Sequence, residues 1–106
     1  MDLAKEIFRL TGLFPPSELY GITAQMRRAV VSIPSNIAEG RRRSTRKDFC
    51  HFLLNAFGSG AELETQVIIS KALPFGKRLD FAKTNTLLDE VMRMLNTMIQ
   101  KLQATS

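Results

Sequence analysis

Five basic side chains lie close together between residues 41 and 47, and side chains of this type bind phosphate groups. With Arg27 and Arg28, they account for seven of the 15 lysines and arginines in the chain, and Glu39 is the one acidic residue between positions 27 and 47. Neutralising phosphates releases condensed counterions, so a cluster of this kind attracts polyanions. A solvated loop that only keeps the protein soluble is the alternative interpretation. The five residues are Arg41, Arg42, Arg43, Arg46 and Lys47.

Residue types suited to catalysis are few. His51 and Cys50 are the only histidine and cysteine among the 106 residues. Asp48 and His51 have the Asp-x-x-His spacing of half a di-iron site, but such a site needs a second histidine-bearing helix and further carboxylates. We therefore interpret His51 as a helix-surface residue and Cys50 as a small buried one. The sequence predicts that the protein is not an enzyme and binds no metal or other cofactor.

Two polar flanks run along the helices predicted on either side of the basic residues. We expect the flanks to face each other and to form a hydrogen-bonded network, in which Arg28 pairs with Glu62 or Glu39. Fully paired polar networks fix helix register and the choice of partner. We therefore interpret the flanks as structural, and a polar ligand site along the bundle is the alternative. The network residues are Gln25, Arg28, Asn36, Glu39, Glu62 and Gln66, with Ser32 and Ser59 on the same flanks.

Apolar residues recur at helical spacing in four segments. Thr45 followed by Asp48 predicts the N-terminal cap of the third helix, and Asp80 predicts that of the fourth. We expect Gly40 to end the second helix in the left-handed conformation. We expect Pro34 to kink that helix, because proline has no N–H to donate, and to turn the arginine block toward one end of the molecule. The segments are residues 2–12, from 17–23 to 38, from 45 to about 73, and from 80 to about 102.

These segments predict an all-α fold, an antiparallel up-down-up-down four-helix bundle with a shortened first helix. We expect one domain over residues 1–106. Because the first helix is less than half as long as the third, part of the core would lack a cover. Either the natural chain begins upstream of Met1 or a partner subunit covers the gap. With no secretory leader and no apolar run near ~20 residues, we expect a cytoplasmic protein that does not enter a membrane.

The second and third helices each carry apolar residues on a second side. A helix that is apolar on two sides needs two partners. One partner is the bundle core, and we expect the other to be a second copy of the chain. Exposed apolar residues scattered over a monomer are the alternative. The residues are Ala24, Val31 and Ala38 on the second helix and Cys50, Leu54, Phe57, Ala61 and Ile68 on the third.

Residues 10–66 contain a series of short motifs whose combination is specific. They are Phe14-Pro15, Tyr20-Gly21, Gln25, Arg28-Ala29, the run SIPSNIAEG from Ser32 to Gly40, Phe52-Leu53, Gly58-Ser59 and the run ELETQ from Glu62 to Gln66. In these motifs the chain resembles the bacterial four-helix-bundle proteins found in intervening sequences of 23S ribosomal RNA genes, a family often labelled ribosomal. The resemblance implies a bundle that assembles as a homopentamer and binds RNA. A related bundle, the accessory variability protein of diversity-generating retroelements, is similar in shape and implies a nucleic-acid-processing protein as a further partner.

Residues and resemblance together predict a non-enzymatic, oligomeric bundle that binds RNA through a basic surface where the second helix meets the third. Arg41, Arg42, Arg43, Arg46 and Lys47 are the expected phosphate contacts, and Arg27 is expected to assist them. The alternative is a protein-interaction scaffold whose basic end docks an acidic or nucleic-acid-processing partner. A pull-down that survives nuclease treatment would favour the scaffold.

Overall fold

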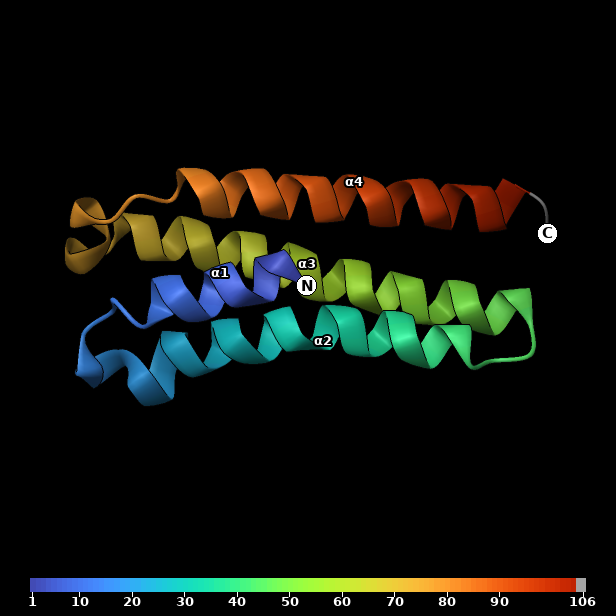
Figure 1. The fold of residues 1–106 in the computed structure, drawn as a ribbon, viewed down its shortest axis with the longest axis horizontal. Helices are drawn as coiled ribbons and strands as arrows, with labels where there is room; N and C mark the ends of the chain where they lie inside the picture. Colours follow the sequence, from blue (N-terminus) through green and yellow to red (C-terminus); the bar gives the residue numbers. More distant parts are fainter. Residues whose placement is uncertain (105–106) are drawn as a thin grey trace.

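The computed structural model describes residues 1–104 and contains four α-helices in that range. They are α1 (Asp2–Thr11), α2 (Ala24–Arg41), α3 (Arg46–Ala72) and α4 (Ala82–Ala104). Each helix runs antiparallel to the next, and α1 contacts both α2 and α4, which closes the bundle (Figure 1). This arrangement confirms the predicted all-α, up-down-up-down four-helix bundle.

Two polar side chains fix the beginnings of α3 and α4. The backbone N–H of Asp48 donates to Thr45 Oγ1 at 3.1 Å, and the N–H of Ala82 donates to Asp80 Oδ1 at 2.9 Å. Such bonds satisfy amide groups that have no partner within the first turn of a helix. Both predicted caps are confirmed, and the first fixes where α3 begins after the turn from α2.

The chain between α1 and α2 is not the simple helix start that periodicity predicts. A 3₁₀ turn over Pro16–Glu18 is followed by a π-helical turn over Leu19–Thr23. Gly21 interrupts that turn with φ −107° and ψ −116°, which are not helical values. The regular helix α2 therefore begins at Ala24, one residue after the expected range for its start.

Gly40 has a different role from the predicted one. The helix α2 continues past it to Arg41, and no glycine within the described residues has a positive φ, so the prediction of a left-handed cap was wrong. Gly40 is buried, and a Cβ atom placed there would lie 2.8 Å from Phe49 Cδ1 and 3.0 Å from Phe52 Cβ. The missing side chain lets α2 and α3 approach closely just before the turn that joins them.

Pro34 lies inside α2, and the helix continues through it. Figure 1 shows α2 gently bowed along its length, in place of the expected kink. Two side chains that follow the proline bond back to the preceding turn: Ser35 Oγ donates to the Val31 carbonyl at 2.9 Å, and Asn36 Nδ2 donates to the Ser32 carbonyl at 2.8 Å. Bonds of this kind accompany bending without ending a helix.

The first helix covers only part of the bundle. At 1.5 Å per residue, the 10 residues of α1 span about 15 Å and the 27 residues of α3 about 40 Å. The chain starts near the middle of the bundle, so α2, α3 and α4 extend beyond α1 toward the α2–α3 turn (Figure 1). The expectation of a short first helix is confirmed. Core residues of the longer helices are nevertheless buried, among them Leu53 of α3 and Leu95 of α4, which are both 0% exposed.

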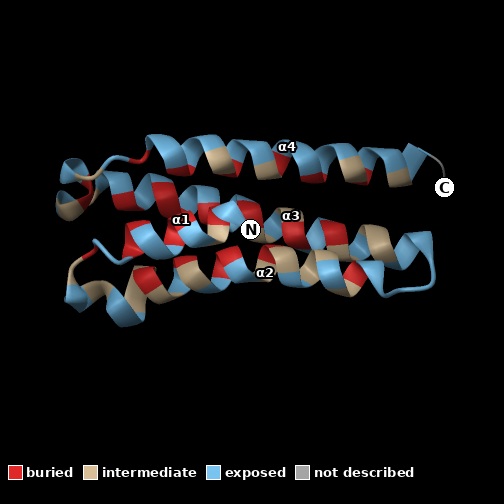
Figure 2. Ribbon diagram, in the orientation of Figure 1, coloured by how far each residue is buried: buried red, intermediate tan, exposed pale blue. Residues whose placement is uncertain are grey.

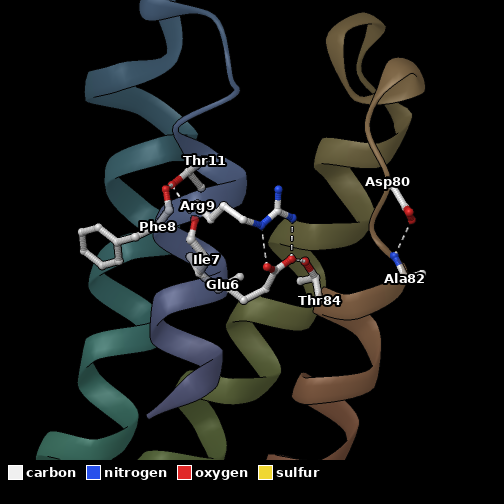
Figure 3. Close-up of polar contacts among 8 residues, drawn as sticks. All are labelled: Glu6, Ile7, Phe8, Arg9, Thr11, Asp80, Ala82 and Thr84. Carbon is white, nitrogen blue, oxygen red and sulfur yellow. Dashed lines mark hydrogen bonds and ion pairs between the residues drawn. The ribbon is translucent and has the colours of Figure 1, made fainter.

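The buried carboxylate of Glu6 fastens α1 to α4 (Figure 3). Arg9 Nε and Nη2 donate to its two oxygens at 2.7 and 2.8 Å, and Thr84 Oγ1 donates to Oε2 at 2.8 Å. The Arg9 bond lowers the pKa of Glu6; burial opposes this shift and the Thr84 bond adds to it. This contact joins residues 78 positions apart, and nothing in the sequence analysis anticipated it.

Candidate nucleic-acid interface

Five cations lie together at the turn from α2 to α3 and define what we call the basic cluster. All five are exposed, and Figure 2 shows this turn in the colour of exposed residues. The turn lies at the end of the bundle away from the α1–α2 connection, beside the last turns of α4 (Figure 1). The cluster consists of Arg41, Arg42, Arg43, Arg46 and Lys47.

Few contacts neutralise the basic cluster. Arg43 Nη2 lies 3.2 Å from Glu39 Oε2, in a pair whose partners are both nearly half exposed. Such surface pairs contribute little energy because water screens them. The Arg43 guanidinium also lies over the Phe52 ring, 4.8 Å from its centroid. Within residues 1–104, no ion pair engages Arg41 or Arg42, so both remain available to an anion.

The start of α3 adds to the positive potential of the cluster. Arg46 and Lys47 are the first two residues of the helix. Amide groups at a helix N-terminus carry a partial positive charge, which favours anions there. Glu39 and Asp48 are the only acidic residues between positions 39 and 48, against five cations. The turn therefore presents a cationic surface with the chemistry of a phosphate-binding site.

Arg27 lies apart from the basic cluster. It is 14 residues before Arg41 on the same helix, about 21 Å away along the axis. Its Nε donates to Thr11 Oγ1 at 2.9 Å, and its guanidinium stacks 4.8 Å from the centroid of the Phe8 ring. Arg27 is half-buried by these contacts with α1. The structure therefore places it in the α1–α2 contact and does not bring it together with the other predicted phosphate ligands.

The predicted polar flanks meet along the contact between α2 and α3. Ser32 Oγ and Ser59 Oγ are 2.9 Å apart and join the two helices directly. Asn36 Nδ2 also donates to Ser32 Oγ, at 3.0 Å. These three half-buried residues form a continuous polar contact between α2 and α3.

Three of the other predicted network residues, Glu39, Glu62 and Gln66, bond within their own helices. Gln66 Nε2 donates to Glu62 Oε1 at 3.1 Å on α3, and Glu39 pairs with Arg43 instead of Arg28. Gln25 and Arg28 are exposed, and no ion pair of Arg28 occurs within residues 1–104. Gln66 is buried, and its Oε1 atom has no hydrogen-bond partner among the described residues.

A cavity of about 450 Å³ adjoins the basic cluster, and the sequence analysis did not anticipate it. It lies between the first turns of α3 and the last turn of α4. The antiparallel order of these helices brings the two ends together, so topology was the signal that could have located it. Cys50, expected to be buried, is half-buried at this cavity. The lining residues are Arg46, Lys47, Cys50, His51, Leu54, Leu102 and Gln103.

Over residues 1–104, no three His, Cys, Asp or Glu side chains gather closely enough to hold a metal ion. None of the helices in the same range combines the length and apolar character that crossing a membrane requires.

Comparison with known proteins places the chain in a family. The model of the 23S rRNA-intervening sequence protein family matches residues 1–97, and the chain belongs to this family. The match confirms the resemblance carried by the motifs of residues 10–66. A search of curated proteins gives no match to the chain.

Proposed function

We propose that this member of the 23S rRNA-intervening sequence protein family binds RNA through the phosphate contacts of its basic cluster. The observation that carries the proposal is the gathering of five exposed cations at one turn, two of which, Arg41 and Arg42, form no ion pair within residues 1–104. Arginine binds phosphate through a planar fork of N–H donors, and three of the five cations are consecutive arginines. Contacts of this type position RNA without reading its sequence.

A pair of matched charge variants tests the proposal. Arg41→Ala with Arg42→Ala removes two exposed cations that form no ion pair, while Arg43 keeps its contacts with α3. Lys77→Ala with Arg78→Ala removes two adjacent exposed cations at the opposite end of the bundle. Both variants change the net charge equally, so any effect of total charge alone is the same in both.

We expect the Arg41/Arg42 variant to bind structured RNA more weakly and to lower the slope of log K against log salt by about one for each lost contact. The Lys77/Arg78 variant should bind like the unmodified protein. Equal loss of affinity in both variants would show that net charge, and not the basic cluster, attracts RNA. Unchanged affinity in the Arg41/Arg42 variant would contradict the assignment of these residues.

We further propose that copies of the chain associate through their exposed apolar side chains. Val31 on α2 is 45% exposed, and Ile68 on α3 is 68% exposed. Burial of such side chains between copies is favourable by about 25 cal/mol for each Å² of apolar surface. The family resemblance implies a pentamer, and cyclic assembly would repeat the basic cluster around a ring. Light scattering should then give five times the mass of one chain, and the mass of a single chain at micromolar concentration would contradict association.

The same RNA experiment separates the scaffold alternative. One result would favour the scaffold: no RNA binds at physiological salt, and a pull-down with the unmodified protein still recovers an acidic protein after nuclease treatment. The basic cluster would then bind a protein partner. Loss of that capture in the Arg41/Arg42 variant would assign the same residues to protein docking.

A further inference from the structure

The cavity between α3 and α4 has an apolar floor. Leu54 from α3 and Leu102 from α4 line it, with Cys50 beside them. Leu54 is 46% exposed because it borders this hollow of about 450 Å³. Cavities of this size hold small organic groups in proteins. An apolar group that enters here would remove Leu54 from water.

The cavity and the basic cluster share residues. Arg46 and Lys47 belong to the cluster and also line the cavity. His51 stands at the same wall, and its ring packs edge-on against Phe52 with the centroids 5.6 Å apart. A ligand that suits this site combines a flat, largely apolar part with an attached anion, because apolar and cationic side chains lie side by side.

A nucleotide is such a ligand, with a base attached to a phosphate through its sugar. We infer that one unpaired nucleotide of a bound RNA places its base in this cavity while its phosphate lies against Arg46 and Lys47. The inference rests on the proposed RNA binding and names the class of RNA: single-stranded, looped or bulged. Bases inside a duplex are stacked and paired, so they are not free to enter a cavity without the cost of unstacking.

Probes with equal numbers of phosphates separate base binding from charge attraction. One is a short oligouridylate, and the other is a ribose-phosphate oligomer of the same length that has no bases. Stacking of a base on an aromatic side chain strengthens binding by about 5- to 150-fold per base, and His51 supplies such a ring at this cavity. We expect the protein to bind the oligouridylate more tightly than the abasic oligomer by a factor in this range, measured by fluorescence anisotropy at one salt concentration.

Two tryptophan variants locate the base. Leu54→Trp fills the cavity without changing the charge. Met94→Trp makes a similar change at an exposed position of α4 that lies outside both this cavity and the proposed contact between copies. Leu54→Trp should abolish the preference for the oligouridylate, and Met94→Trp should preserve it. A preference that survives in Leu54→Trp would overturn the inference, because the base would then lie elsewhere.

The outcome for the unmodified protein distinguishes this inference from the proposed function. Equal binding of both probes, with affinity that falls as salt rises, would overturn base binding while leaving phosphate binding by the cluster intact. Failure of both probes and of structured RNA to bind would overturn the proposed function and this inference with it.

A chemical measurement needs no variant. Cys50 lines the cavity and is the only cysteine in the chain, so alkylation by N-ethylmaleimide reports on this site alone. At equal occupancy of the protein, the oligouridylate should slow alkylation more than the abasic oligomer does. Equal protection by the two probes would contradict entry of a base into the cavity.

Discussion

Replacement of Thr84 by valine tests how α1 is held on the bundle. The Thr84 hydroxyl is fully buried and donates to the buried carboxylate of Glu6 at 2.8 Å. Valine keeps the shape of threonine but cannot donate, so Glu6 loses one of its three hydrogen-bond donors. Hydrogen bonds to charged groups contribute about 1.5–3 kcal/mol. We therefore expect Thr84→Val to lower the free energy of unfolding at pH 7 by roughly this amount.

The loss should depend on pH in a definite direction. The pKa of Glu6 is lowered in the folded protein, chiefly by the Arg9 hydrogen bond. Ionised Glu6 therefore adds stability that is fully present above its unfolded pKa of about 4.3 and is lost as pH falls through the lower folded pKa. Below that pKa the Thr84 bond joins two neutral groups, for which about 0.5–1.5 kcal/mol is typical. The effect of Thr84→Val should shrink accordingly.

Urea unfolding at pH 7 and in strong acid measures both values, with the protein concentration held constant because association would shift the midpoint. Thr97→Val is the control, since Thr97 is exposed on the same helix. It should change the free energy of unfolding by less than about 0.5 kcal/mol at either pH. An effect of Thr84→Val that matches the control, or that does not change with pH, would refute the role assigned to Glu6 and Thr84.

Four further changes have expected outcomes. Gly76→Ala should destabilise the protein by about 3 kcal/mol in thermal or urea unfolding, because a Cβ atom would lie 1.8 Å from the Ser70 carbonyl oxygen, which cannot move aside cheaply. Gly58→Ala should instead stabilise α3 by about 0.5–1 kcal/mol, since no atom lies within 4 Å of its added methyl group; a loss of stability there would be inconsistent with the structure. Ile68→Glu should lower the mass measured by light scattering while leaving the helical circular dichroism unchanged, and an unchanged mass would remove Ile68 from the proposed contact between copies. Pro34→Ala should restore a backbone donor and stabilise α2 in urea unfolding, and a loss of stability would show that the bow of α2 is required for packing.

Much of the fold followed from local patterns. Residues three and four apart share one face of a helix, so apolar periodicity gave four helices. The side chains of Thr45 and Asp80 cap helices within two or three residues of their own positions, and both caps could be predicted for that reason. The basic cluster could also be predicted from the sequence, because its five members are neighbours in the chain and a surface turn exposes them together.

Features that depend on contacts between residues far apart in the sequence could not be predicted from local patterns. A glycine near a helix end can serve as a left-handed cap or can let two helices pack closely. The positions of Phe49 and Phe52 show that Gly40 lets α2 and α3 pack closely. Arg27 looked like a member of the basic stretch, yet its contacts with Phe8 and Thr11 required knowledge of how α1 packs. The cavity beside the basic cluster likewise exists only because the end of α4 meets the start of α3.

The measurement that tests the central claim most directly is binding of structured RNA to the unmodified protein over a salt series, from roughly 50 to 300 mM, with the oligomeric mass determined in the same buffer. Each phosphate contact contributes about −0.7 to −0.9 to the slope of log K against log salt, so contacts by most of the basic cluster predict a slope of about −2 or steeper. Binding at micromolar concentration or below near physiological salt, with such a slope, is the expected result. Absence of binding at physiological salt, or affinity that salt does not change, would contradict the claim that the basic cluster binds RNA phosphates.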